Sequence, residues 1–135
     1  LRALVIDDDK DTCEHACVLL DQLGQKTEYA LSGKEGIEKI KQAMQDNDPF
    51  DICFLDWKMP EMDGEATARE IRKIVGPETL IIIISAYDWS PIEGRAKEIG
   101  VNGFIAKPFF SSSFYNWLSD PSIKENKGRD KDIVV

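Results

Sequence analysis

Four short apolar runs in this chain each end at a polar residue, and this pattern strongly limits how the chain can fold. Each run has the length of a β-strand, and unbroken apolar runs are typical of strands buried on both faces of a parallel sheet. The carboxyl ends of parallel strands form the ligand crevice of an open sheet, so we expect the polar residues to meet there. The runs and the residues after them are Leu4–Ile6 with Asp7, Asp8 and Asp9, Ile52–Leu55 with Asp56, Leu80–Ile84 with Ser85, and Phe104–Ala106 with Lys107 and Pro108.

Helical patterns separate these strands. The segment Asp11–Leu23 carries apolar or small residues three and four apart, and Gly24 follows it as a helix-ending residue. A short strand is expected at Lys26–Leu31, after which Ser32 and Glu35 form a capping box that begins a second helix. The other helices are predicted over Glu65–Val75, from Ser90 as N-cap residue, and along an apolar stripe of Phe110, Phe114, Trp117 and Leu118.

The repeated strand–helix order predicts an α/β fold. Five such units imply a doubly wound parallel sheet with right-handed crossovers and helices on both faces. A length of 135 residues fits one domain. Residues 121–135 show no core pattern, so we expect a domain over 1–120 followed by a linker or tail. Because the chain starts at Leu1 and enters a strand almost at once, we expect a domain cut from a longer protein or a processed start.

Composition excludes several classes of function. The formal charge of −8 argues against direct nucleic-acid binding, which depends on Lys and Arg contacts to phosphates. No apolar run approaches the roughly 20 residues of a membrane helix, and no secretion leader is visible. A zinc site is not expected because the chain has a single histidine, His15, and no CxxC pair. The cysteines are expected to be reduced thiols in a cytoplasmic protein.

The predicted crevice collects acids that can hold a cation. Asp7, Asp8 and Asp56 would repel one another in a partly dry site, and a divalent cation relieves that repulsion. Oxygen ligands without nitrogen or sulfur donors favour Mg²⁺. We expect Asp8 and Asp56 to coordinate directly, Asp7 directly or through water, and Lys58 through its backbone carbonyl.

The same residues can support phosphoryl transfer. A carboxylate can act as a nucleophile and form an acyl phosphate. Transfer also requires neutralisation of charge on the moving oxygens, which Mg²⁺, the Lys107 ammonium and the Ser85 hydroxyl could provide. Asp56 is the predicted nucleophile because it is a single acid at the end of the most central-looking strand.

These stretches resemble a response-regulator receiver domain, and the resemblance covers residues 1 to about 120. It implies a flavodoxin-like (βα)5 fold with strand order 2-1-3-4-5. The region from Ser85 to Glu93 is similar to receivers fused to hybrid sensor histidine kinases. The matching stretches are Val5–Asp8, Leu55–Pro60 with Asp63 and Gly64, Ile84–Ala86, and Gly103–Phe109.

The resemblance also implies roles. Asp56 would be the phosphoacceptor, Asp7 and Asp8 the acidic pair for Mg²⁺, and Ser85 and Lys107 the contacts to the phosphoryl group. Ser85 and Phe104 match the switch positions, although Phe104 lacks a phenol hydroxyl. We also hypothesise that Lys58 and Tyr87, two residues beyond Asp56 and Ser85, restrict attacking water and lengthen the life of the acyl phosphate.

A receiver domain of this kind would be a signalling module of a two-component phosphorelay. It would take a phosphoryl group from a histidine kinase or histidine phosphotransfer domain, and it would catalyse only its own phosphorylation and dephosphorylation. We expect a cytoplasmic location, free or tethered to a membrane-bound kinase, with no membrane contact by the domain itself.

Two alternatives remain at the level of the sequence. The chain also resembles haloacid-dehalogenase-like phosphatases at Asp7-x-Asp9, with Asp7 as nucleophile and Asp9 as acid, but it offers no clear cap domain or late acidic pair. The other alternative is a degenerate receiver that binds partners without being phosphorylated, although its acidic pocket would normally be broken.

Overall fold

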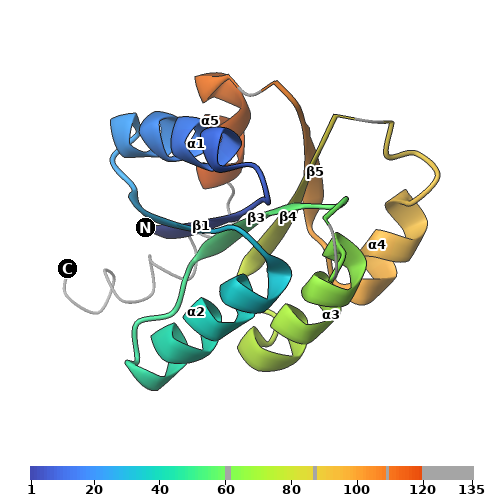
Figure 1. Cartoon of the computed structure of the whole chain (residues 1–135), viewed down its shortest axis with the longest axis horizontal. Coiled ribbons are helices and arrows are strands. Elements are labelled where there is room, and N and C mark those ends of the chain that lie inside the picture. The colour runs from blue at the N-terminus through green and yellow to red at the C-terminus, as the bar shows by residue number, and fades with distance from the viewer. Residues whose placement is uncertain (60–61, 87, 109, 120–135) are drawn as a thin grey trace.

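The computed structural model describes residues 1–59, 62–86, 88–108 and 110–119 of the chain. Within these residues, strands and helices alternate as the sequence predicts, and Figure 1 shows their arrangement. The elements are β1 (Arg2–Ile6), α1 (Lys10–Gln22), β2 (Lys26–Ala30), α2 (Gly33–Gln45), β3 (Ile52–Asp56), α3 (Gly64–Val75), β4 (Leu80–Ser85), α4 (Glu93–Ile99), β5 (Gly103–Ala106) and α5 (Ser111–Leu118).

The strands form one parallel sheet in the order β2-β1-β3-β4-β5. This confirms the doubly wound, flavodoxin-like order expected from the sequence. Helices α1 and α5 lie on one face of the sheet, and α2, α3 and α4 lie on the other (Figure 1). β2 lies on one side of β1 and β3 on the other, so the strand order reverses between β1 and β3. In an open parallel sheet, ligands bind at the carboxyl ends of the strands where the order reverses.

The strand side chains divide between two buried clusters, one under each layer of helices. Every residue of β3 and β4 is buried, and their side chains alternate between the two faces. Cys53, Leu55 and Ile83 pack toward α2, α3 and α4, whereas Phe54 and Ile82 pack toward α1 and α5. A strand covered on both faces needs apolar residues at every position, which explains the unbroken runs of the sequence.

The predicted start of α4 was wrong. Ser90 is not an N-cap residue, because its backbone N–H and its hydroxyl both donate to Asp88 Oδ1, at 3.0 and 2.8 Å. The helix instead begins at Glu93, with Ile92 as an N-cap residue that makes no side-chain hydrogen bond. A local hydrogen bond from an Asp side chain competes with helix initiation, and here it keeps Ser90 in a turn.

Phe110 also departs from its prediction. It precedes α5 and is 65% exposed, while Phe114 and Leu118 are the buried residues of that helix. The ring of Phe114 meets that of Phe54 edge to face, with centroids 4.9 Å apart. The apolar stripe of α5 therefore begins one turn later than the sequence suggests.

Arg72 joins three segments at the amino end of the sheet. Its guanidinium donates to the carbonyls of Gly76 and Thr79, at 2.5 and 2.8 Å, and to Gly100 O and Asn102 Oδ1, at 2.6 and 2.9 Å. These contacts tie the end of α3 to the start of β4 and to the connection between α4 and β5. The Arg72 guanidinium is half-buried. Without it, these acceptors would lose their hydrogen-bond donor.

Replacing Arg72 should therefore destabilise the fold. We expect Arg72→Met to lower the free energy of unfolding by about 2–3 kcal/mol, since hydrogen bonds to charged groups are lost and acceptors are left unpaired. Arg69→Met is the matched control, because Arg69 is exposed and its ion pair with Glu65 in the same helix is worth about 0.5 kcal/mol or less. Urea denaturation of both variants measures the difference, and equal losses would contradict a clamping role for Arg72.

Candidate functional site

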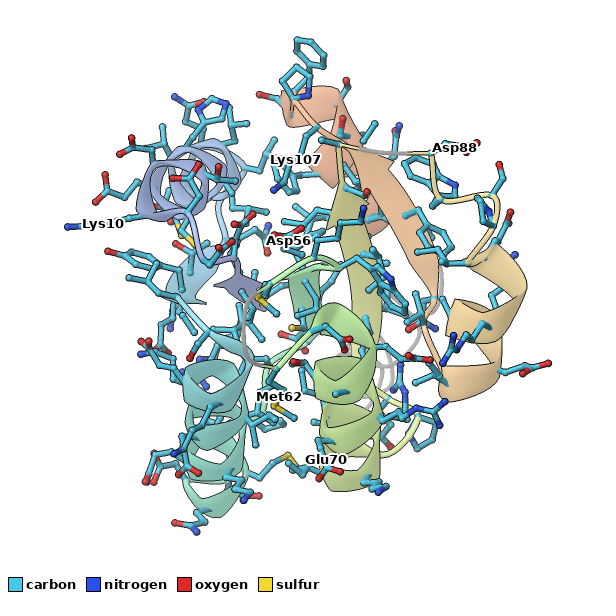
Figure 2. The ribbon with its side chains drawn as sticks, turned by 45° about the vertical axis from the view of Figure 1, so that its right-hand side comes forward. Lys10, Asp56, Met62, Glu70, Asp88 and Lys107 are labelled. Atoms are coloured by element: carbon cyan, nitrogen blue, oxygen red, sulfur yellow. The ribbon has the colours of Figure 1, made fainter. Side chains whose placement is uncertain are left out.

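Two of the predicted acids stand side by side at the carboxyl edge of the sheet. Asp56 is the last residue of β3, and Asp7 directly follows β1. Because Ile6 pairs with Leu55 in the parallel register, the next residues of the two strands are neighbours. Both acids are buried: Asp7 has no exposed surface, and Asp56 is 7% exposed. Figure 2 shows Asp56 and Lys107 on the same side of the molecule, close to the ends of the strands.

Asp8 completes a carboxylate cluster with these two acids. Each of Asp7, Asp8 and Asp56 offers an oxygen, and these oxygens all lie within 4.8 Å of one another. Asp8 is exposed, so the cluster opens to solvent on its side. Three carboxylate oxygens at this spacing suit a hard divalent cation such as Mg²⁺.

The backbone after β1 holds the first acid in place. The N–H of Asp9 donates to Asp7 Oδ1 at 2.9 Å. Asp9 itself is the N-cap residue of α1, and its carboxylate accepts from the Thr12 hydroxyl at 2.7 Å and from the Asp11 N–H at 3.2 Å. The Thr12 hydrogen bond is the main cause that holds the pKa of Asp9 below its usual range, so Asp9 is an ionised cap rather than a proton donor.

Lys107 supplies the positive charge of the site. Its Nζ lies 2.8 Å from Asp7 Oδ2 and 3.7 Å from Asp56 Oδ1. The residue follows β5, and its N–H donates to the Ser85 carbonyl at 2.9 Å, which fastens it to the end of β4. Burial favours the neutral amine, but the hydrogen bond and charge of Asp7, with the charges of Asp56 and Asp8, outweigh it and raise the pKa of Lys107.

The surroundings of Asp56 raise the pKa of its carboxyl group. Burial, and next the negative charge of Asp7, raise its pKa to about 6. Lys107 and a hydrogen bond from the Lys58 backbone N–H act in the opposite direction but do not compensate. The ionised cluster therefore carries more negative charge than one lysine can balance, which is a further reason for the site to fit a divalent cation.

The other predicted site residues are placed as follows. Ser85 ends β4 and is 7% exposed, one residue beyond Ile84, which pairs with Asp56. Lys58 follows Asp56 by two residues and is exposed, whereas Phe104 lies on β5 and is half-buried. The roles of the Ser85 hydroxyl, the Lys58 carbonyl and Phe104 stay predictions, and Tyr87 lies outside the described residues.

Gly64 shows how tightly the chain folds around Asp56. Its N–H donates to the Trp57 carbonyl at 2.9 Å, so the segment before α3 returns to the end of β3. A Cβ on Gly64 would lie 2.5 Å from Trp57 Cα and 2.6 Å from the Asp56 carbonyl oxygen, which are backbone atoms that cannot move aside cheaply. The pair Asp63 and Gly64 was visible in the sequence, but this close backbone approach was not.

An open groove of about 420 Å³ lies beside the carboxylates. Helix α1 contributes Asp11, Thr12 and His15 to its lining, and the other wall is formed by Ala86, Lys107 and Pro108. His15 is an exposed helix residue, as expected. The groove reaches Lys107, so a partner bound there would touch the residue that contacts both buried acids.

The burial of Asp56 predicts that its charge costs stability. An acid whose pKa is raised in the folded state contributes stability at low pH that is lost as the pH rises toward the folded pKa, here from about 4 to about 6. In EDTA at pH 7.5, Asp56→Asn should therefore raise the free energy of unfolding by about 1–3 kcal/mol, and the gain should be roughly halved at pH 5.

Urea denaturation with and without Mg²⁺ measures this effect. Added Mg²⁺ should stabilise the parent and leave Asp56→Asn nearly unchanged, because a ligand stabilises only the folded state that binds it. A variant less stable than the parent at pH 7.5 in EDTA would show that Lys107 outweighs burial and repulsion.

Comparison with known proteins identifies the family of this chain. Residues 3–118 match the response regulator receiver domain family. The relatives include the histidine kinase CKI1 of Arabidopsis thaliana, with 35% identity over a 119-position alignment that covers 78% of this chain and 11% of the kinase. They also include the osmosensing histidine protein kinase SLN1 of Saccharomyces cerevisiae, with 30% identity over 110 residues, 80% of this chain and 9% of the kinase. The chain thus spans only a small part of these proteins.

Solved structures show the same fold. The receiver domain of CKI1, solved in complex with Mg²⁺ and BeF₃⁻, has 31% identity and a TM-score of 0.72, covering 88% of this chain and 90% of that one. The Vibrio cholerae chemotaxis protein CheY4, at 24% identity and a TM-score of 0.78, covers 87% of this chain and 94% of its own and supports the fold alone. From the family match and this agreement in fold, we conclude that the chain belongs to the response regulator receiver domains of two-component signal transduction.

Proposed function

We propose that Asp56 is the phosphoacceptor of this receiver domain and that the donor is a phosphohistidine. The observation that carries the proposal is the contact of Lys107 Nζ with both Asp7 and Asp56 beside the three-carboxylate cluster. In the reaction an Asp56 carboxylate oxygen forms a bond to phosphorus while the bond from phosphorus to the imidazole nitrogen breaks. The product is an acyl phosphate on Asp56, and the imidazole leaves with its electron pair.

The residues around Asp56 have separate tasks in this proposal. Asp7 and Asp8, with Asp56 and the Lys58 carbonyl, would hold Mg²⁺, which when bound neutralises charge on the phosphoryl oxygens. Lys107 keeps its proton, because its pKa is raised, and its ammonium can pair with a phosphoryl oxygen. The Ser85 hydroxyl, at the end of the neighbouring strand, would donate a hydrogen bond to another oxygen.

Phosphorylation changes the charge balance that positions Lys107. In the structure the ammonium contacts Asp7 more closely than Asp56, at 2.8 against 3.7 Å. A phosphoryl group on Asp56 would add acceptor oxygens on the side where the contact is now longer. We propose that Lys107 and Ser85 move toward it and that Phe104, three residues before Lys107 on β5, changes its position as a result.

The relatives and the charge support a proposal for the partner and the setting. We propose a histidine kinase or a histidine phosphotransfer domain as phosphodonor, and no catalysis beyond the domain's own phosphorylation and dephosphorylation. The formal charge of −8 argues against direct contact with nucleic acid or with anionic lipid, and the location that we propose is cytoplasmic. Among the residues that the structure describes, no helix is long and apolar enough to span a membrane.

The hydrolase alternative is not favoured. It requires Asp9 to donate a proton, but Asp9 caps α1 and its pKa lies below the usual range. It also requires Asp7 as nucleophile, and Asp7 is completely buried and paired with Lys107. A degenerate receiver would lack part of the cluster, whereas here Asp7, Asp8, Asp56 and Lys107 lie together.

Labelling of the chain tests the assignment of Asp56. Incubation with Mg²⁺ and a small phosphodonor such as acetyl phosphate should add one phosphoryl group to the parent, detected by intact-protein mass spectrometry. Asp56→Asn should lose the modification, and EDTA should prevent it. Asp9→Asn is the matched control, because it removes an acid from the same edge of the sheet, and it should be labelled like the parent.

Either of two results would contradict the proposal. Labelling of Asp56→Asn as strongly as the parent would place the phosphoryl group elsewhere. Steady hydrolysis of the donor that depends on Asp7 and Asp9, without a stable product on Asp56, would favour the hydrolase.

The exposed Lys58 side chain supports a further expectation about the lifetime of the acyl phosphate. If this side chain restricts the approach of water to Asp56, Lys58→Ala should lose its phosphoryl group several-fold faster than the parent. The rate can be followed by mass spectrometry after removal of the donor. Loss no faster than in the parent would exclude this shielding role.

A further inference from the structure

Trp89 and Phe104 form a stacked aromatic pair beside the proposed site. Their ring centroids are 5.3 Å apart and the ring planes differ by 13°. Trp89 lies in the connection between β4 and α4, and Phe104 lies on β5. Both are half-buried, and Phe104 also packs against the core cluster beneath α2, α3 and α4.

Trp89 also fixes the entry into α4. Its carbonyl accepts a hydrogen bond at 2.9 Å from the N–H of Ile92, the residue immediately before the helix. The carbonyl of Ile92 in turn accepts the N–H of Ala96 at 2.8 Å. One residue thus connects the face of Phe104 to the first turn of α4. Figure 2 labels Asp88, the preceding residue, on the same connection and at the same end of the molecule as Lys107.

Among the described residues, the start of α4 is held by the buried side chain of Ala96 and otherwise by weak contacts. The helix has seven residues and no side-chain cap. It also contains Gly94, and a Cβ added there would have no neighbouring atom within 4 Å. Glycine inside a helix weakens it, and a helix this short is not stable by itself. The Arg95 guanidinium reaches Glu65 on α3, but Arg95 is mostly exposed, and exposed ion pairs contribute little.

The connection that carries Trp89 begins at the proposed site. It follows Ser85, whose hydroxyl is proposed to move toward a phosphoryl group on Asp56. In this proposal, a displacement of Ser85 acts on the start of the connection, while the stack on Phe104 holds Trp89 farther along it. A contact made in one conformation and lost in another biases the equilibrium toward the first.

We propose that Trp89 is a positioning residue whose stack on Phe104 holds the first turn of α4 and opposes the conformation adopted when Asp56 is phosphorylated. The regulatory half of this inference rests on the proposed function of Asp56. The structural half, the restraint of α4, does not. Aromatic pairs of this kind change an equilibrium by about 2- to 12-fold.

Three variants of the full chain separate the stack from other effects. Trp89→Leu removes the aromatic face and keeps an apolar side chain, whereas Trp89→Phe keeps a ring that can stack. Tyr115→Leu is the matched control, because it makes the same kind of change at an exposed aromatic residue of α5.

Two measurements on each variant decide the proposal. The first is amide hydrogen exchange without added ions, read at Ala96 in α4, at Gly100, the residue that follows α4, and at Ile40 in α2. The second is titration with beryllofluoride and Mg²⁺, a mimic of the aspartyl phosphate, followed by chemical shifts. Trp89→Leu should exchange about 2- to 12-fold faster in α4 but not in α2 and should bind beryllofluoride about 2- to 12-fold more tightly, with Trp89→Phe and Tyr115→Leu close to the parent.

The outcomes distinguish the two proposals. Unchanged exchange in α4 of Trp89→Leu overturns the restraint, whatever the titration shows. Faster exchange with equal or weaker beryllofluoride binding makes Trp89 structural only and overturns its regulatory role. If the parent itself does not bind beryllofluoride, the assignment of Asp56 fails, and the restraint of α4 is then judged on hydrogen exchange alone.

Discussion

The contact between one ammonium and two buried carboxylates organises this protein. Lys107 is the charge that allows Asp7 to be completely buried next to Asp56, and it is positioned by the edge strand β5 and the end of β4. The balance is incomplete, because the pKa of Asp56 remains raised to about 6. A site with this excess of negative charge favours groups that bring positive charge, and a divalent cation followed by a phosphoryl group is the combination that such a site can accept.

The strand order makes this crowding unavoidable. β1 and β3 are neighbours in a parallel sheet, so the residues that follow the two strands, or end them, lie at the same edge of the sheet. Gly64 brings the next segment against the backbone of Asp56 and Trp57, so the chain is closely packed at the end of β3. The sheet therefore stores electrostatic strain at the point where the chemistry is proposed, while the apolar interior on both of its faces supplies the stability that tolerates it.

The segments at the amino edge of the sheet are held by more hydrogen bonds than the start of α4 at the carboxyl edge. Arg72 ties α3, β4 and the entry to β5 together at the amino edge of the sheet, through hydrogen bonds to four acceptors. At the carboxyl edge, α4 is short, lacks a side-chain cap and begins at a turn held by Asp88 and Trp89. A receiver that signals by moving part of its surface needs such a difference, because only weakly held segments respond to a change of a few kcal/mol at the site.

The sequence by itself determined the alternation of strands and helices, the parallel sheet and the acids at its edge. These features follow from local patterns: unbroken apolar runs, helical spacing and a polar residue at each strand end, with the receiver resemblance adding the strand order. Only the tertiary structure decided that Ser90 belongs to an Asp88 turn, that Phe110 is exposed, that Lys58 donates its N–H to Asp56 and that Trp89 stacks on Phe104. The stack and the charge balance of Asp56 join residues far apart in the chain, and the other features depend on how a short segment competes for partners and burial in the folded protein, so periodicity and propensity along the sequence carry no signal for them.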